Sequence, residues 1–192
     1  MNNSLFQEKV VPFLLTFALL MVGTVIADFL LHQFQLVWIG RYLGIPGTIL
    51  ILLSFLYTLR KRKMIQVGNP KFWLNLHGLF TWLGTLMILV HAGIHFNAIL
   101  PWLAIIAMLI NVISGLTGKF LLNRAQRYLS SKKTDLLQQG MSSKSLEKEI
   151  FWDAVTFDIM KKWRAVHFPI TLVFSVLSLI HIISIFLFWE WK

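Results

Sequence analysis

Four histidines stand in two matched pairs on strongly apolar stretches of the chain. His77 and His91 end the run HGLFTWLGTLMILVH, and His167 and His181 end the run HFPITLVFSVLSLIH, so the members of each pair are fourteen positions apart. In an α-helix, fourteen residues rise about 21 Å and turn about 1400°, about 40° short of four full turns. Each pair therefore lies near one stripe of its helix at opposite ends. Imidazoles in such surroundings are ligands for iron, copper or zinc.

The elements that carry these histidines are expected to cross a membrane. The 192 residues are 57% hydrophobic and have a mean hydropathy of +0.70, which is too apolar for a soluble domain. A helix needs about 20 apolar residues to cross a bilayer core. The segments that meet this length are 10–31, 43–59, 72–96, 99–122 and 166–189. None alternates like a barrel strand. We predict an all-α membrane protein, a five-transmembrane-helix bundle forming one domain over residues 1–192.

The positive charges predict the orientation of this bundle. Most of the eighteen Lys and Arg residues fall between the second and third segments or between the fourth and fifth. Because such residues stay on the cytoplasmic side, the N-terminus and loop 120–165 are expected to be cytoplasmic and the C-terminus external. The net charge of +10 is then explained by topology and anionic lipid, with no nucleic-acid partner expected. The short loops favour a bacterial or archaeal plasma membrane.

In this orientation the two histidine helices run in the same direction. His77 is then level with His167 as an inner pair, and His91 with His181 as an outer pair. Two facing imidazoles are the axial ligands that a low-spin haem iron takes. The chain has no cysteine, so any metal must be held by histidine or carboxylate. Gly84, midway between His77 and His91, is expected to let a flat cofactor approach the backbone.

Three stretches carry a resemblance to a known family. They are WLNLHGLFTWLGTLMILVHAGIHF, ISGLTGKFLL and KKWRAVHFPITLVFSVLSLIH, within residues 72–189. Together they resemble bacterial di-haem membrane cytochromes b of the ferric-reductase-like type. The resemblance implies that the four histidines hold two b-type haems. Lys119 stands where an arginine is more usual. Lys119 and Arg164 are expected to meet propionates of the inner haem, or else only to set topology with snorkelling side chains.

The sequence predicts electron transfer without a complete enzyme. It contains no dinucleotide-binding glycine motif, no P-loop and no nucleophile elbow, and no soluble segment long enough to bind flavin or nicotinamide. We therefore expect a di-haem cytochrome subunit of a larger oxidoreductase system. It would carry electrons between a redox partner or the quinone pool and a partner on the other face.

Three alternatives remain open at this stage. The chain could itself oxidise quinol or reduce a metal. His95, one helical turn after His91, and His32 would then form an outer quinone or metal site, with Asp28 as a proton relay. His95 could also replace His91 as a ligand. The chain could instead be a histidine-lined metal transporter, or a structural anchor without a cofactor.

The long connection 120–165 differs from the membrane segments in mixing charged and polar residues. Gly140 and the serines after it are expected to break it into two short amphipathic helices around a turn. The segment could be a docking surface for a redox partner or a linker lying against lipid headgroups.

Overall fold

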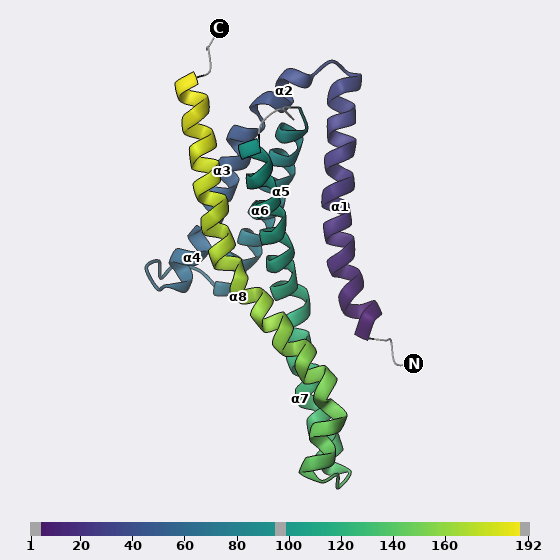
Figure 1. Ribbon diagram of the computed structural model, residues 1–192. Coiled ribbons are helices and arrows are strands. Elements are labelled where there is room, and N and C mark those ends of the chain that lie inside the picture. Colours follow the sequence, from purple (N-terminus) through teal and green to yellow (C-terminus); the bar gives the residue numbers. More distant parts are fainter. Residues whose placement is uncertain (1–4, 95–98, 189–192) are drawn as a thin grey trace. The chain divides into compact units, whose positions relative to one another are not determined.

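The protein is all-α, as the sequence predicts. The computed structural model describes residues 5–94 and 99–188, leaving out the side chains of 5–10, 94, 120–125, 143, 144, 152, 156, 160 and 164. No strand occurs in this part of the chain. The helices, drawn in Figure 1, are α1 (Leu5–Gln33), α2 (Val37–Tyr42), α3 (Gly44–Ser54), α4 (Leu56–Lys61), α5 (Pro70–Ile94), α6 (Ile99–Leu116), the π-helix η1 (Thr117–Leu122), α7 (Asn123–Gln138) and α8 (Ser143–Phe188).

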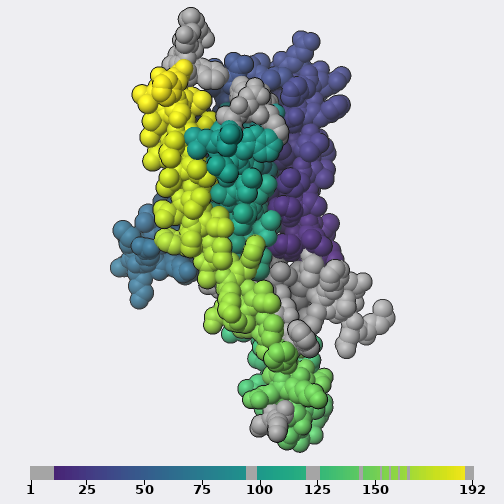
Figure 2. Space-filling model, in the orientation of Figure 1, coloured from purple at the N-terminus to yellow at the C-terminus, as the bar shows by residue number. Residues whose placement is uncertain are grey.

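Five helical stretches among the described residues are long and apolar enough to cross a membrane. They are Val11–Gln33, Val37–Lys61, Pro70–Gly93, Ile99–Lys119 and Asp153–Phe188. The chain is thus a multi-pass membrane protein. Many of its apolar side chains are exposed, as lipid-facing side chains must be. The C-terminal part of α8, yellow in Figure 2, lies at the surface, and within it Leu179, Phe186 and Leu187 are 57%, 67% and 70% exposed.

The second span is longer than predicted and is built from three helical pieces. The sequence predicts 43–59, whereas α2, α3 and α4 together cover Val37–Lys61. The break after Tyr42 has a simple cause. Pro46 has no N–H to donate to the carbonyl of Tyr42, so the regular hydrogen bond between these positions is missing. Pro46 instead occupies the first turn of α3, where a missing donor costs little.

By contacts between its residues, the chain divides into two compact units. One contains residues 18–108 and 174–192. In this unit α3 packs along α5, with α2 and α4 against the two ends of α5. Gly47 and Gly84 meet at this interface. A Cβ on Gly84 would lie 2.9 Å from the carbonyl oxygen of Gly47, and one on Gly47 would lie 3.1 Å from that of Gly84. Only glycine at both positions permits this close approach.

The other unit contains residues 1–17 and 109–173. Here η1 continues α6, α7 follows, and the chain turns back into α8. Gly140 has a φ of +79° in the turn, as favours glycine. The turn is confirmed, but a short second helix is wrong, because α8 runs unbroken for 46 residues. The stretch from Ser143 to Phe168 contains neither glycine nor proline, so nothing in it ends the helix.

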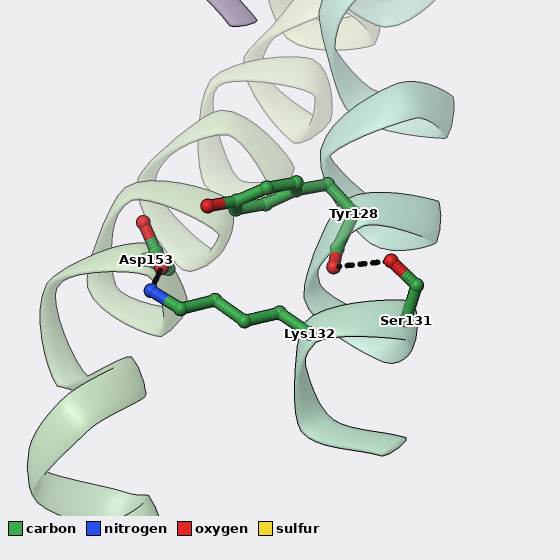
Figure 3. A network of polar contacts seen from close by, with 4 residues as sticks. All are labelled: Tyr128, Ser131, Lys132 and Asp153. Carbon is green, nitrogen blue, oxygen red and sulfur yellow. Dashed lines mark hydrogen bonds and ion pairs between the residues drawn. The ribbon is translucent and has the colours of Figure 1, made fainter. Parts of the chain in front are cut away.

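One ion pair joins α7 to the beginning of α8. Lys132 Nζ lies 2.8 Å from Asp153 Oδ2 and 5.9 Å from the centre of the Tyr128 ring, as Figure 3 shows. In the same view, the Ser131 hydroxyl donates to the carbonyl oxygen of Tyr128 at 3.2 Å. The hydrogen bond to Asp153 and the charge of that carboxylate raise the pKa of Lys132 above its ordinary value. The pair thus holds the two helices of this hairpin together.

Candidate functional site

His77 is oriented by the backbone of the second span. Its Nδ1 lies 3.0 Å from the carbonyl oxygen of Ser54, the last residue of α3. The ring is half-buried and also contacts the ring of Tyr57 on α4, with centres 5.4 Å apart. Since a carbonyl oxygen can only accept, His77 donates from Nδ1–H. In the neutral imidazole, Nε2 then carries the lone pair.

His91 is held in the same manner two heptads later on α5. Its Nδ1 lies 3.3 Å from the carbonyl oxygen of Gly40 on α2. Gly44 lies against the same ring, since a Cβ at that position would come within 2.9 Å of the imidazole Cδ2. As at His77, a carbonyl acceptor fixes the Nδ1–H form of the ring. A hydrogen bond of this kind is what usually orients a metal-ligating histidine.

The two spans face each other in a register that advances by seven residues. Ser54 accepts from His77, Gly47 faces Gly84, and Gly40 accepts from His91. Seven residues are about two helical turns, so these contacts follow one stripe on each of two antiparallel segments. The stripe that carries the histidines of α5 is therefore positioned by small residues and carbonyl groups of α2 and α3.

The same register changes the interpretation of Gly84. A Cβ at Gly84 would meet not only Gly47 but also the Ile51 side chain, at 3.0 and 3.1 Å. The space that the glycine provides is therefore filled by α3. We revise the expectation that Gly84 admits a flat cofactor: Gly84 lets α3 approach α5 closely, so that the carbonyl of Ser54 on α3 reaches His77 and that of Gly40 on α2 reaches His91.

The structure brings His91 and His181 together from α5 and α8. Their ring centres are 6.5 Å apart and the ring planes are inclined by 56°. Two imidazoles that share one metal along a line, each with a metal–nitrogen distance of about 2 Å, have ring centres about 6 Å apart. Rings on such a line can be rotated freely about it. The separation of His91 and His181 therefore fits two imidazoles that would hold one metal between them.

His167 on α8 has a different partner, the hydroxyl of Ser114 on α6. Its Nδ1 lies 2.7 Å from Ser114 Oγ, and the same Oγ lies 2.8 Å from the carbonyl oxygen of Asn111. A serine hydroxyl has one hydrogen, which the Asn111 carbonyl can only accept. Ser114 therefore accepts from His167, which donates from Nδ1–H. Three of the four histidines thus present Nε2 as the lone-pair nitrogen.

The predicted inner pair is divided between the two compact units. His77 belongs to the unit 18–108 and 174–192, and His167 to the unit 1–17 and 109–173. Their pairing stays a prediction. Within the described residues, no three His, Cys, Asp or Glu side chains gather as a metal-binding group. Histidines acting in twos are what a haem needs from a protein, because the porphyrin supplies the other four ligands.

The predicted cationic and outer residues are placed only in part. Lys119 lies in η1 and is exposed, whereas the side chain of Arg164 lies outside the described residues. His95 also lies outside them. His32 is exposed at the end of α1, with Nδ1 2.9 Å from the carbonyl oxygen of Asp28 and 3.6 Å from its Oδ1. That Oδ1 is buried and lies 3.4 Å from where a Cβ on Gly93 would stand.

The partners of the histidine nitrogens were missed from the sequence. Two of them are backbone carbonyls, which every residue has, so the residue type does not identify them. A signal was nevertheless present in the sequence. Gly40, Gly47 and Ser54 are spaced seven residues apart, as are the stripe residues His77, Gly84 and His91 on α5. Small residues at regular spacing are typical of close helix packing in membranes. Ser114 had no comparable signal, since serine is common in membrane helices.

The fold defines an all-helical, multi-pass membrane protein. The chain matches no model of a known protein family, no curated protein and no solved structure.

Proposed function

We propose that the protein is a di-haem b-type membrane cytochrome, the electron-transfer subunit of a larger redox system. The observation that carries this proposal is the pair His91 and His181, whose ring centres are 6.5 Å apart between two membrane helices. The likeness of residues 72–189 to bacterial di-haem cytochromes b supports it. A second haem would be held by His77 and His167.

The donor chemistry fits a haem at each level. Neutral imidazoles with a protonated Nδ1 bind iron through Nε2. His77, His91 and His167 each have an acceptor at Nδ1 within 3.3 Å. The helices that carry them are predominantly apolar, which suits a largely hydrophobic macrocycle. When bound, the haems supply one-electron oxidation and reduction.

The chain contributes orientation and insulation to this function. The carbonyls of Ser54 and Gly40 prevent the rings of α5 from turning. Helices of about 20 apolar residues exclude water and ions from the region between the two levels. Lys119, exposed at the end of the fourth span, supplies a cation near the inner level. We assign Arg164 the same role from its place in the sequence, three residues before His167.

The proposed setting is a bacterial or archaeal plasma membrane, with a redox partner or the quinone pool on one side. The histidines lie near opposite ends of their helices, so electrons would pass between the two membrane faces. His32 and Asp28 lie beside the outer level. They would serve exchange with a quinone rather than haem binding.

The test is a reduced-minus-oxidised visible spectrum with a haem count on the purified full-length protein. We expect about two b haems per chain in the wild type. His91→Ala and His181→Ala should each lose the same haem, and His77→Ala and His167→Ala the other. His32→Ala is the matched control and should keep both. Colourless wild-type protein that binds zinc or iron without porphyrin would instead support a metal transporter and overturn the proposal.

A further inference from the structure

The three proposed haem ligands whose Nδ1 partners are described above, His77, His91 and His167, are not equivalent. Two of them donate to backbone carbonyls, of Ser54 and of Gly40. His167 donates to a side chain, the hydroxyl of Ser114. The distance between His167 Nδ1 and Ser114 Oγ is 2.7 Å, the shortest of the three. Ser114 is only 1% exposed, so no water replaces its hydroxyl from bulk solvent. The acceptor at His167 is thus the one that a single substitution can remove.

The Ser114 hydroxyl is itself held in place. Its hydrogen points to the carbonyl oxygen of Asn111 at 2.8 Å, which leaves its lone pairs for His167. On α8, the Thr171 hydroxyl donates to the carbonyl oxygen of His167 at 2.7 Å. The side-chain amide nitrogen of Asn111 donates to the Thr171 hydroxyl at 3.1 Å and to the carbonyl oxygen of His167 at 2.9 Å. Asn111 and Thr171 therefore tie α6 to α8 one turn away from the contact of Ser114 with His167. With its own hydrogen on the Asn111 carbonyl, the Ser114 hydroxyl is the acceptor in that contact.

A fixed acceptor at Nδ1 has a known effect on a ligating imidazole. It orients the ring, sets the tautomer and makes the ring a stronger electron donor. Stronger donation stabilises ferric iron more than ferrous iron, and so lowers the reduction potential.

We propose that Ser114 is a positioning residue that fixes the tautomer of His167 and lowers the reduction potential of the haem bound there. This inference rests on the proposed function. It also predicts that the two haems differ in reduction potential. The outer ligand His91 has only a backbone carbonyl, that of Gly40, as the acceptor at Nδ1, at the longer distance of 3.3 Å.

The chain offers a close control for this role. Thr117, in η1, also carries a buried hydroxyl, at 7% exposed, which donates to the carbonyl oxygen of Ile113 at 2.8 Å. That hydrogen bond stays within the continuous helix of α6 and η1. Thr117→Val therefore deletes a buried hydroxyl and keeps the acceptor of His167, whereas Ser114→Ala deletes that acceptor.

The experiment is a potentiometric titration of the purified holoprotein, following the haem absorbance of wild type, Ser114→Ala, Ser114→Thr and Thr117→Val. We expect Ser114→Ala to keep two haems and to raise one midpoint potential. A tenfold change in the relative affinity for ferric and ferrous haem corresponds to about 59 mV. Ser114→Thr, which keeps the hydroxyl, should show the wild-type value, and Thr117→Val should leave both potentials unchanged.

The outcomes separate this inference from the proposed function. Wild-type protein without haem overturns the function and the role of Ser114 with it. Two haems with unchanged potentials in Ser114→Ala overturn only the role of Ser114. If Ser114→Ala does not hold haem, the same titration is made on Ser114→Cys. A thiol fills about the same space as the hydroxyl but is a weaker hydrogen-bond acceptor. A rise in one potential supports the inference, and wild-type potentials in Ser114→Cys overturn it.

Discussion

Gly84 and Gly47 lie so close that a Cβ added to Gly84 would stand 2.9 Å from the carbonyl oxygen of Gly47. The contact lies midway between the hydrogen bonds of His77 to Ser54 and of His91 to Gly40. The separation of α3 and α5 at the glycines therefore controls whether the carbonyls at both ends can reach the imidazoles. A packing contact in the middle of the membrane is thus part of the geometry of both histidine levels.

Gly84→Ala should accordingly weaken both proposed haem sites. The added methyl meets backbone at Gly47, which cannot move aside as a flexible side chain would. Overpacking of this kind costs about 1–3 kcal/mol. We expect lower thermal stability and fewer haems per chain, measured by unfolding and by haem count.

Gly23→Ala is the control for this substitution. Its Cβ would lie 3.4 Å from the end of the Leu86 side chain, an ordinary contact on another face of α5. Gly23→Ala should keep the haem content and stability of the wild type. Equal losses in the two variants would show that the α3–α5 approach has no special role.

Gly44→Ala should act on the outer level alone. A methyl at Gly44 would come within 2.9 to 3.1 Å of three atoms of the His91 ring and would push the ring from its bond to Gly40. We expect loss or a changed spectrum of one haem, the same one that His181→Ala removes, with the other unaffected.

The matched variant for Gly44→Ala is Gly115→Ala. Its Cβ would lie 3.5 Å from His167 Cε1, which is a normal van der Waals distance. Gly115→Ala should therefore leave both haems bound. A uniform loss of both haems in Gly44→Ala would contradict an effect confined to His91.

The sequence predicted the membrane helices well because length and apolar composition are local properties. The stripe of His77, Gly84 and His91 was also correct, since helical periodicity fixes it. The structural role of Gly84 could not be predicted, because it depends on which helix packs against this face of α5, and the sequence does not show that the helix is α3. The continuity of α8 through Ser143–Phe188 was missed for another reason. Polar composition in 143–165 suggested a boundary, but this stretch contains no glycine or proline, and α8 continues even through Pro169.

Lys119 is expected to tune a haem potential by charge alone. Lys119 is exposed, so its field is weakened by water and by salt. Lys119→Gln should lower one midpoint potential by less than Ser114→Ala raises it, because removing a cation disfavours the added electron. Lys119→Arg should preserve the potential.

The change in midpoint potential caused by Lys119→Gln should shrink as salt is raised from about 10 mM to 1 M, where the Debye length falls to about 3 Å. A shift that is independent of salt would contradict an electrostatic cause.

The ion pair of Lys132 and Asp153 should stabilise the α7–α8 hairpin only while the lysine is charged. The pair raises the pKa of Lys132 above its unfolded value, so its contribution is complete below the ordinary lysine pKa of about 10.4. The contribution is lost as the pH rises through the higher pKa of the folded state. Because both side chains are partly exposed, it is at most about 1 kcal/mol. We expect protease cleavage near Gly140 to be faster for Lys132→Met than for wild type at pH 7, with the difference shrinking as the pH rises through the raised pKa of Lys132. Lys133→Met, at the neighbouring exposed lysine, should match wild type throughout. Equal cleavage of Lys132→Met and Lys133→Met at pH 7 would show that the ion pair does not hold the hairpin.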